Sequence, residues 1–303
     1  MPQLTGPTEC SELLTMATRS RPRSGRQRPA TYSADSATVD SPTGEGLQPD
    51  SGPAKAVDAT AVPALRVRDR IAAFADSRLP VITRGVIRVG SVWAGQLSSG
   101  DRTYSIDGFE LAVNTGVAPP VIEFHRTLLA GITGGHVIDL GCGSGYLSVF
   151  AAKAGARVTA VDINELAIEN TRANAAAAGV AEQVTARLSN VLDGVAEKAD
   201  YIVVNPPWFD HALGERFRAT SSPTLWSQLF AGARSRLAPG GELRIFIPRF
   251  RVPAVTARAL HHGWSGPTLT LLEPKGSRLT RWLKPVPVVL PSMAVATFAT
   301  DPR

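Results

Sequence analysis

The chain has 303 residues, of which 44% are hydrophobic, and it carries a formal net charge of +6 at pH 7. This length and composition allow a sizeable buried core, in one large domain or in one domain with appendages. No apolar run approaches the roughly 18 to 20 residues needed to cross a membrane, and no apolar signal-peptide core follows a basic start, so we expect a cytoplasmic protein without a membrane partner.

Cysteine usage argues against a disulfide scaffold and against a metal site. The two cysteines, Cys10 and Cys142, are too few and too far apart for a disulfide framework. No cluster of Cys and His has the spacing of metal ligands, so we expect no bound metal. The basic balance permits a polyanionic partner, but it bears on solubility and steering before it bears on substrate.

Residues 1–61 are predicted to be a disordered, low-complexity tail. They are rich in Ser, Thr, Pro, Gly and Ala and lack a sustained period of 2 or 3.6, so they cannot bury enough surface to offset their ordering entropy. Within them lies a cluster of basic residues: Arg19, Arg21, Arg23, Arg26 and Arg28. This cluster is either a phosphate-contacting arm or an extension without function, and the absence of interleaved aromatic residues favours the extension.

Residues 62–118 are predicted to form a small subdomain that contains a helix and β-strands. The stretch 64–75 places Leu65, Ile71 and Phe74 at near-helical spacing, and residues 81–93 are rich in Val and Ile. Residues 104–113 read as two short strands joined by an Asp-Gly turn at Asp107.

Residues 119–303 alternate strand and helix in the manner of an α/β fold. Residues 137–140 are a short apolar run typical of a buried parallel strand, and glycines follow at 141, 143 and 145. Four further strands are predicted at 157–161, 183–188, 199–204 and 242–247. Helices are predicted at 121–130, after the glycines, from Asn164 to about 178, at 225–237 before the breaker sequence 239–241, and at 252–262. Two strand-like runs separated by a basic loop follow between 268 and 299. We therefore expect a Rossmann-like, doubly wound, mostly parallel sheet.

The glycine turn indicates a nucleotide-like ligand. Closely spaced glycines let the backbone approach a ligand, and the next helix directs its free N–H groups there. The pattern G-C-G-S-G, preceded by Asp139 in the strand, differs from the G-x-G-x-x-G of dinucleotide-binding turns. It resembles motif I of class I S-adenosylmethionine-dependent methyltransferases, and Asp162 at the tip of the second strand matches the ribose-binding acid of that family. The alternative is an ordinary turn between a strand and a helix.

This resemblance implies S-adenosyl-L-methionine as the cofactor. The residues implied to bind it are Asp139, Gly141, Cys142, Gly143, Gly145, Tyr146, Asp162, Ile163, Ser189, Asn190 and Asn205. Family members usually have an acid facing the adenine amino group where this chain has Asn190, whose amide can serve that group or act as a turn cap. Residues 114–123 resemble the segment that folds over the methionine end of the cofactor in amino-methyltransferases.

The sequence Asn205-Pro206-Pro207-Trp208 ends the fourth predicted strand. It resembles the D/N-P-P-Y/F/W motif of methyltransferases that act on adenine, cytosine, guanine or glutamine amino groups, which implies that these four residues are catalytic. The Asn205 oxygen and the Pro206 carbonyl can hold the two N–H groups of an acceptor, and Trp208 can stack on a planar acceptor. The alternative is a tight turn.

The expected function is therefore methylation of an amino or amide nitrogen in RNA, in DNA or in a protein glutamine. Basic residues after the fifth predicted strand support a macromolecular acceptor: Arg249, Arg251, Arg258, Lys275, Arg278, Arg281 and Lys284. An alternative is a small-molecule enzyme of specialised metabolism, including one that closes S-adenosylmethionine to an azetidine and releases methylthioadenosine. A third is a non-catalytic module that has kept the fold. The sequence alone leaves the acceptor unknown.

Overall fold

The computed structural model describes residues 100–120, 125–207, 222, 224–272 and 293–301. All of them belong to one compact unit, Ser51–Arg303. The predicted tail, the predicted helix at 64–75, the Val- and Ile-rich stretch at 81–93 and Trp208 lie outside the described residues. None of the helices in the described ranges combines the length and the apolar character that a membrane-spanning helix requires.

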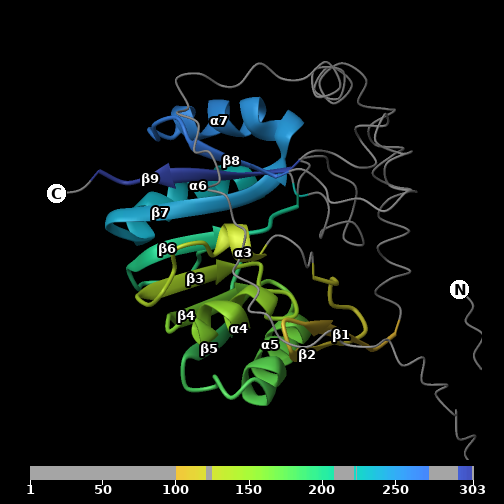
Figure 1. The fold of residues 1–303 in the computed structure, drawn as a ribbon. Coiled ribbons are helices and arrows are strands. Elements are labelled where there is room, and N and C mark those ends of the chain that lie inside the picture. The colour runs from red at the N-terminus through yellow and green to blue at the C-terminus, as the bar shows by residue number, and fades with distance from the viewer. Residues whose placement is uncertain (1–99, 121–124, 208–221, 223, 273–292, 302–303) are drawn as a thin grey trace, which may run out of the picture. The chain divides into compact units, whose positions relative to one another are not determined.

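A seven-stranded sheet forms the framework of this unit (Figure 1). Its strands in chain order are β3 (His136–Leu140), β4 (Arg157–Asp162), β5 (Val184–Leu188), β6 (Ala199–Val204), β7 (Leu237–Pro248), β8 (Thr268–Leu272) and β9 (Met293–Ala299). Their order across the sheet is β5-β4-β3-β6-β7-β9-β8. The first five are parallel, whereas β9 is antiparallel to both β7 and β8. The prediction of a mostly parallel, doubly wound sheet is confirmed, and the antiparallel β9 departs from the all-parallel 3-2-1-4-5-6 order of dinucleotide-binding folds.

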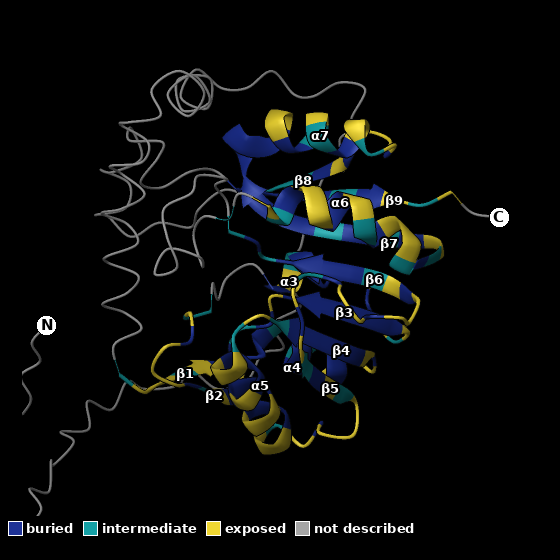
Figure 2. Cartoon of the chain, turned by 180° about the vertical axis from the view of Figure 1, so that it is seen from behind, coloured by how far each residue is buried: buried dark blue, intermediate teal, exposed yellow. Residues whose placement is uncertain are grey.

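Helices cover the two faces of the sheet and bury its apolar side chains (Figure 2). One face packs on α3 (His125–Leu128), α4 (Tyr146–Lys153) and α5 (Glu165–Ala177), and the other on α6 (Leu225–Arg236) and α7 (Val252–His261). Successive side chains of a strand point to opposite faces, so Val137 of β3 joins the first core and Ile138 the second. As predicted, Asn164 caps α5, since its side chain accepts a hydrogen bond from the Leu166 N–H.

A separate hairpin precedes the sheet in the chain. Its strands, β1 (Arg102–Ile106) and β2 (Phe109–Val113), are antiparallel and turn at Asp107-Gly108, as predicted. Both turn residues have positive φ, 49° and 76°, which is the geometry of a type I′ turn. The apolar face of the hairpin, including Phe109 and Leu111, packs on Tyr146 and Val149 of α4.

The start of β7 differs from the prediction. Residues 239–241 were expected to end a helix and precede a strand, but α6 ends at Arg236 and β7 begins at Leu237. Ala199 pairs with Leu237 and Tyr201 pairs with Glu242, so β7 bulges between these two pairs. The glycines therefore lie inside a distorted strand, because the flanking residues still find partners on β6.

Candidate active site

The glycine turn and the Asn-Pro-Pro sequence leave the sheet from neighbouring strands. Leu140 of β3 is paired with Val204 of β6, and these are the last residues of their strands. Gly141 and Asn205 therefore begin their loops at adjacent points of the carboxyl edge. The chain order reverses between β3 and β6, and this is the place where ligands bind in open α/β sheets.

The glycine turn needs glycine for two different reasons. Gly141, Gly143 and Gly145 all have positive φ, between 53° and 76°. A Cβ on Gly145 would lie 2.8 Å from the Thr171 Cα, so α5 could not pack on the turn. A Cβ on Gly141 would meet nothing within 4 Å, so the space beside this residue is open. A turn that is packed on one side and open on the other is suited to hold a ligand against its backbone.

Asp162, at the end of β4, is oriented by backbone groups. One carboxylate oxygen accepts a hydrogen bond from the Gly143 N–H at 3.0 Å, and the other accepts from the Asn164 N–H at 2.9 Å. Each oxygen has a second lone pair, so the carboxylate can still accept from the two hydroxyls of a ribose. Ile163, the next residue, is 45% exposed, so an apolar side chain lies beside this carboxylate without being buried by the chain itself.

Asp139 lies beneath the glycine turn as a buried acid. Its Oδ2 accepts a hydrogen bond from the Ser148 hydroxyl at 2.6 Å, while its Oδ1 is buried and has no hydrogen-bond partner in the described part of the chain. Burial raises the pKa of Asp139 to about 7, and the nearby charge of Asp162 adds to this effect, while the Ser148 hydrogen bonds oppose it. The orphan oxygen is a buried acceptor available to a ligand or to a water molecule.

Cys142 is held inside the turn as a neutral thiol. The side chain is buried, and its sulfur lies 3.3 Å from the Thr171 hydroxyl. Burial raises the pKa of the Cys142 thiol, and the carboxylates of Asp139 and Asp162 raise it further. A thiol in this state is a poor nucleophile, so Cys142 contributes to the turn through its backbone and its small size.

The structure buries Tyr146, one of the predicted cofactor-binding residues, beneath the hairpin. Its hydroxyl hydrogen-bonds to Nδ1 of His125, and Nε2 of that ring lies 3.1 Å from the Asp107 carboxylate. An acceptor at Nε2 places the ring proton there, so Nδ1 accepts from the tyrosine. Burial raises the pKa of Tyr146, so the phenol stays protonated. Its side chain is thus occupied, and only its backbone N–H, in the first turn of α4, is placed to meet a cofactor. No local sequence signal indicated this chain of three side chains.

Ser189 and Asn190 follow β5 in a short turn. The Ser189 hydroxyl donates to the Asp193 carbonyl at 2.6 Å, and the Asn190 side chain donates to the Asp193 carboxylate at 3.0 Å. Val191 between them has a φ of 54°. The turn-cap role that the sequence left open is therefore present, and contact of the exposed Asn190 with an adenine stays a prediction.

The segment after β2 lies across the glycine turn. The Ala118 carbonyl is 3.9 Å from the position of a Cβ on Gly143, and the Gly116 carbonyl accepts from the Asn164 side chain at 3.1 Å. Val117 is fully buried among the hairpin residues and Tyr146. The described residues of this segment are therefore placed where the family resemblance expects a wall of the cofactor site.

Asn205, Pro206 and Pro207 follow β6, with Pro206 buried and its two neighbours half-buried. Of the motif, Trp208 lies outside the described residues, as do Asp210 and His211. The predicted catalytic set is thus described at three of its four positions, and their roles stay predictions.

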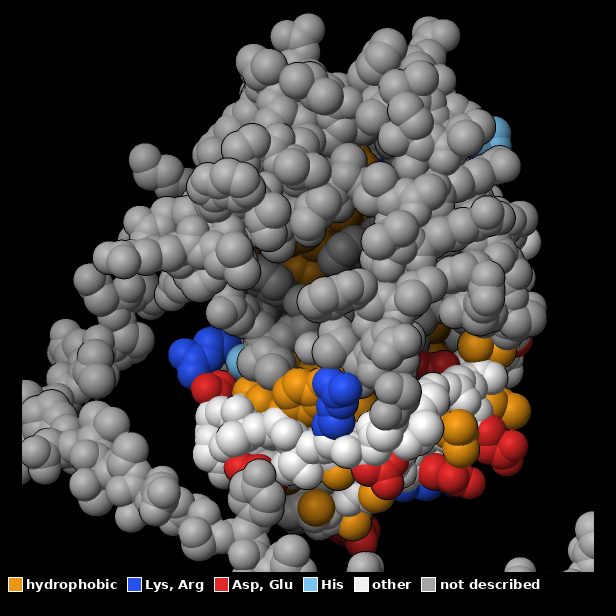
Figure 3. All heavy atoms as spheres, turned by 90° about the vertical axis from the view of Figure 1, so that its right-hand side faces the viewer, with side chains coloured by type: hydrophobic (Ala, Val, Ile, Leu, Met, Phe, Trp, Pro, Cys, Tyr) orange, Lys and Arg blue, Asp and Glu red, His pale blue; other side chains and the backbone are white. Residues whose placement is uncertain are grey.

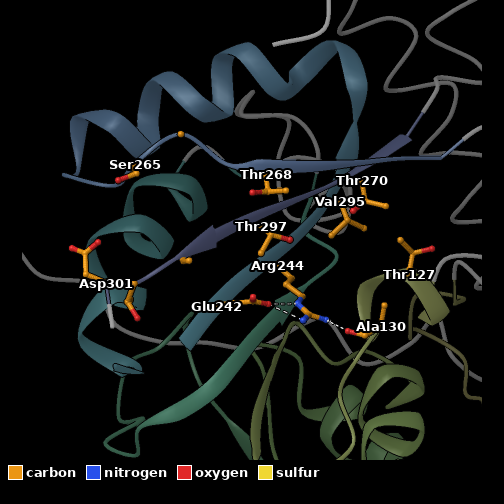
Figure 4. Close-up of a pocket in the computed structure, with 13 residues that line it drawn as sticks. Thr127, Ala130, Glu242, Arg244, Ser265, Thr268, Thr270, Val295, Thr297 and Asp301 are labelled. Carbon is orange, nitrogen blue, oxygen red and sulfur yellow. Dashed lines mark hydrogen bonds and ion pairs between the residues drawn. The ribbon is translucent and has the colours of Figure 1, made fainter. Parts of the chain in front are cut away.

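A hollow elsewhere on the sheet contains none of the predicted site residues. It lies over β7, β8 and β9 near the end of α3 and is lined by hydroxyl side chains such as Thr268 and Thr297 (Figure 4). Its central cation, Arg244, contacts Glu242 at 2.7 Å and donates to the Ala130 carbonyl at 2.6 Å. These contacts attach the end of α3 to the sheet, which is a structural role.

The basic residues predicted to contact phosphate are distributed differently from the expectation. Arg249 and Arg251 lie in the short 3-10 helix η4 (Arg249–Arg251) and are only 6% and 4% exposed, so they do not form an open basic surface. Lys275, Arg278, Arg281 and Lys284 lie outside the described residues. On the face shown in Figure 3, the described surface carries acidic and basic side chains side by side.

Comparisons with known proteins agree with this geometry. Residues 124–259 match the family model described as methyltransferase small domain. The chain is 33% identical over 154 residues to ribosomal RNA small subunit methyltransferase C of Pseudomonas aeruginosa, which covers 50% of this chain and 42% of that protein. It is 40% identical over 97 residues to ribosomal protein L11 methyltransferase of Oceanobacillus iheyensis, which covers 31% of each chain. The chain thus spans less than half the length of these curated relatives.

The fold has a counterpart among solved structures. A Streptococcus mutans structure described as an S-adenosylmethionine-dependent methyltransferase superposes with a TM-score of 0.51 at 16% identity, covering 66% of this chain and 55% of that one. The open space beside Gly141, the oriented Asp162 carboxylate and the orphan oxygen of Asp139 fit the cofactor of such enzymes. The chain therefore carries, over residues 124–259, a methyltransferase small domain, and its core is that of a class I S-adenosylmethionine-dependent methyltransferase.

Proposed function

We propose that this protein methylates an amino nitrogen, and that the acceptor is an RNA base. The observation that carries the proposal is the pairing of Leu140 with Val204, which sets Asn205 beside the glycine turn. A side chain at that position is close to any cofactor that binds across Gly141.

The cofactor supplies an electrophilic methyl group when it is bound. An amino group conjugated to a base is a weak nucleophile, because its lone pair is delocalised into the ring. The Asn205 side-chain oxygen and the Pro206 carbonyl can each accept one N–H of such a group and leave its lone pair directed at the methyl carbon. Two consecutive prolines restrict the backbone and remove competing N–H donors. Asn205 has no basic side chain, so the rate enhancement comes from positioning and electrostatics.

The relatives support RNA as the acceptor class. One is named as a ribosomal RNA methyltransferase and the other as a ribosomal protein methyltransferase. The match to the first is longer, covering half of this chain against about a third for the second. We therefore assign RNA, and a protein acceptor becomes an outcome of the test.

The test uses the full chain with isotopically labelled S-adenosylmethionine, alone, with total RNA and with ribosomal protein. The expected result is S-adenosylhomocysteine that forms only with RNA, together with an N-methylated nucleoside found by mass spectrometry after digestion. Product that depends on protein alone would overturn the RNA assignment. Methylthioadenosine formed without any acceptor would replace methyl transfer by cyclisation, and no binding of S-adenosylhomocysteine in calorimetry would overturn the enzymatic proposal itself.

A further inference from the structure

Three buried polar side chains on α5 form a row that faces the hairpin and the glycine turn. Asn170, Thr171 and Asn174 are each at most 1% exposed. Leaving a buried polar group unpaired costs free energy, so the partners of these three side chains show what the row holds in place. The row is not part of any motif that the sequence analysis singled out.

Two of the three hold carbonyl groups of the glycine turn. The Thr171 hydroxyl donates to the Gly143 carbonyl at 3.2 Å, with the Cys142 sulfur at 3.3 Å as a second acceptor. The Asn174 side-chain amide donates to the Ser144 carbonyl at 2.8 Å. Both bonds pull backbone oxygens of the turn toward α5, on the side where Gly145 already packs against Thr171.

The C=O and N–H groups of a trans peptide point in opposite directions. Holding the Gly143 carbonyl against α5 therefore turns the Ser144 N–H away from α5. The Gly143 N–H is directed at the Asp162 carboxylate at 3.0 Å, so the orientation of this carboxylate also depends on the turn. The α5 row thus sets the direction of backbone donors and of the acid at the site.

Asn174 also connects the turn to the hairpin. Its side chain accepts from the Ala112 N–H at 3.0 Å and donates to the Ala112 carbonyl at 2.6 Å. Asn170 makes similar bonds, donating to the Ala112 carbonyl at 3.0 Å and accepting from the Asn114 N–H at 3.0 Å, but neither of these contacts reaches the glycine turn. The two asparagines are therefore a matched pair with one difference.

We propose that Thr171 and Asn174 are positioning residues for cofactor binding, which act by fixing the peptide orientations of the glycine turn. The inference rests on the proposed use of S-adenosylmethionine. It concerns this chain's own residues, so it can be tested by binding without any acceptor.

The first comparison uses Thr171→Val and Thr171→Ser. Valine keeps the shape but removes the hydroxyl, and serine keeps the hydroxyl. We expect Thr171→Val to raise the Kd for S-adenosylhomocysteine about five- to tenfold, the factor that corresponds to one lost hydrogen bond, and Thr171→Ser to restore most of the affinity. Titration calorimetry gives the Kd together with the stoichiometry, so loss of folded protein would lower the stoichiometry without changing the Kd.

The second comparison uses Asn174→Ala and Asn170→Ala. Both remove hydrogen bonds to the hairpin and should lower the melting temperature to a similar extent. Only Asn174→Ala should also raise the Kd for S-adenosylhomocysteine and the KM for S-adenosylmethionine by more than its control, with kcat at saturating cofactor changed less than KM. Equal affinities in Thr171→Val, Asn174→Ala and the wild type would overturn the positioning role. Failure of the wild type to bind S-adenosylhomocysteine would instead overturn the proposed function.

Discussion

Leu140 and Val204 are direct partners in neighbouring parallel strands, and each is the last residue of its strand. Adjacent strands lie about 4.8 Å apart, so the loops that follow begin at nearly the same place. One loop is the glycine turn and the other begins with Asn205. Bringing a donor site and an acceptor site together in this way is the principal contribution a scaffold makes to a transfer between two bound molecules.

Asn205→Ala should slow turnover and leave cofactor affinity nearly intact. The side-chain oxygen is expected to hold the acceptor amine during transfer, so its loss should lower kcat about a hundredfold. Steady-state kinetics would measure kcat, and calorimetry with S-adenosylhomocysteine would measure affinity. Asn205→Asp keeps an acceptor oxygen and should retain more activity. Full activity in Asn205→Ala would show that the assigned role is wrong.

Asp162→Ala should weaken cofactor binding. The change removes an acceptor for the ribose hydroxyls and leaves the N–H groups of Gly143 and Asn164 without their partner. We expect the Kd for S-adenosylhomocysteine to rise about tenfold to a hundredfold, since hydrogen bonds to a charged group are stronger than neutral ones. Glu169→Ala removes an exposed acid from α5 and is the control for the change in charge. The ribose assignment fails if the two variants bind equally well.

Gly145→Ala and Gly141→Ala should separate folding from binding. Both residues have positive φ, so an alanine at either position is strained by about 1 to 2 kcal/mol. At Gly145 the new methyl would also collide with Thr171, which should add roughly 1 to 3 kcal/mol of destabilisation.

Denaturant unfolding should therefore find Gly145→Ala the less stable variant, whereas calorimetry should find Gly141→Ala impaired in binding S-adenosylhomocysteine, because its methyl enters the open space beside the turn. Normal binding by a folded Gly141→Ala variant would argue that the cofactor does not use that space.

The stability of the cofactor-free protein should depend on pH through Asp139. Its pKa is raised to about 7 from an ordinary 3.8, so the folded state binds the proton more tightly than the unfolded state. The stabilisation from protonated Asp139 is complete below pH 3.8 and is lost as pH rises through about 7.

Asp139→Asn removes this titration. The stability of the variant relative to the wild type should therefore increase by about 1.4 kcal/mol per pH unit between pH 4 and pH 7, and level off above that range. Chemical denaturation at several pH values would measure it. A difference that does not vary with pH would mean that Asp139 titrates normally in the folded protein.

The sequence by itself determined the local parts of this protein. The positive-φ glycines, the acid at the end of β4, the cap at Asn164 and the Asp-Gly turn of the hairpin are each set by residues within a few positions of one another, so their chemistry can be recognised along the chain. The alternation of buried strands and helices indicated the fold class for the same reason.

Only the tertiary structure decided which of these parts meet. The placement of β9 between β7 and β8, the burial of Tyr146 under the hairpin and the bulge at the start of β7 depend on pairings between distant segments. Asn174 looks like any polar residue of a helix in the sequence, yet it bonds to Ala112, which lies 62 positions away. Its importance arises because folding removes both groups from water, after which each requires a partner that local sequence cannot identify.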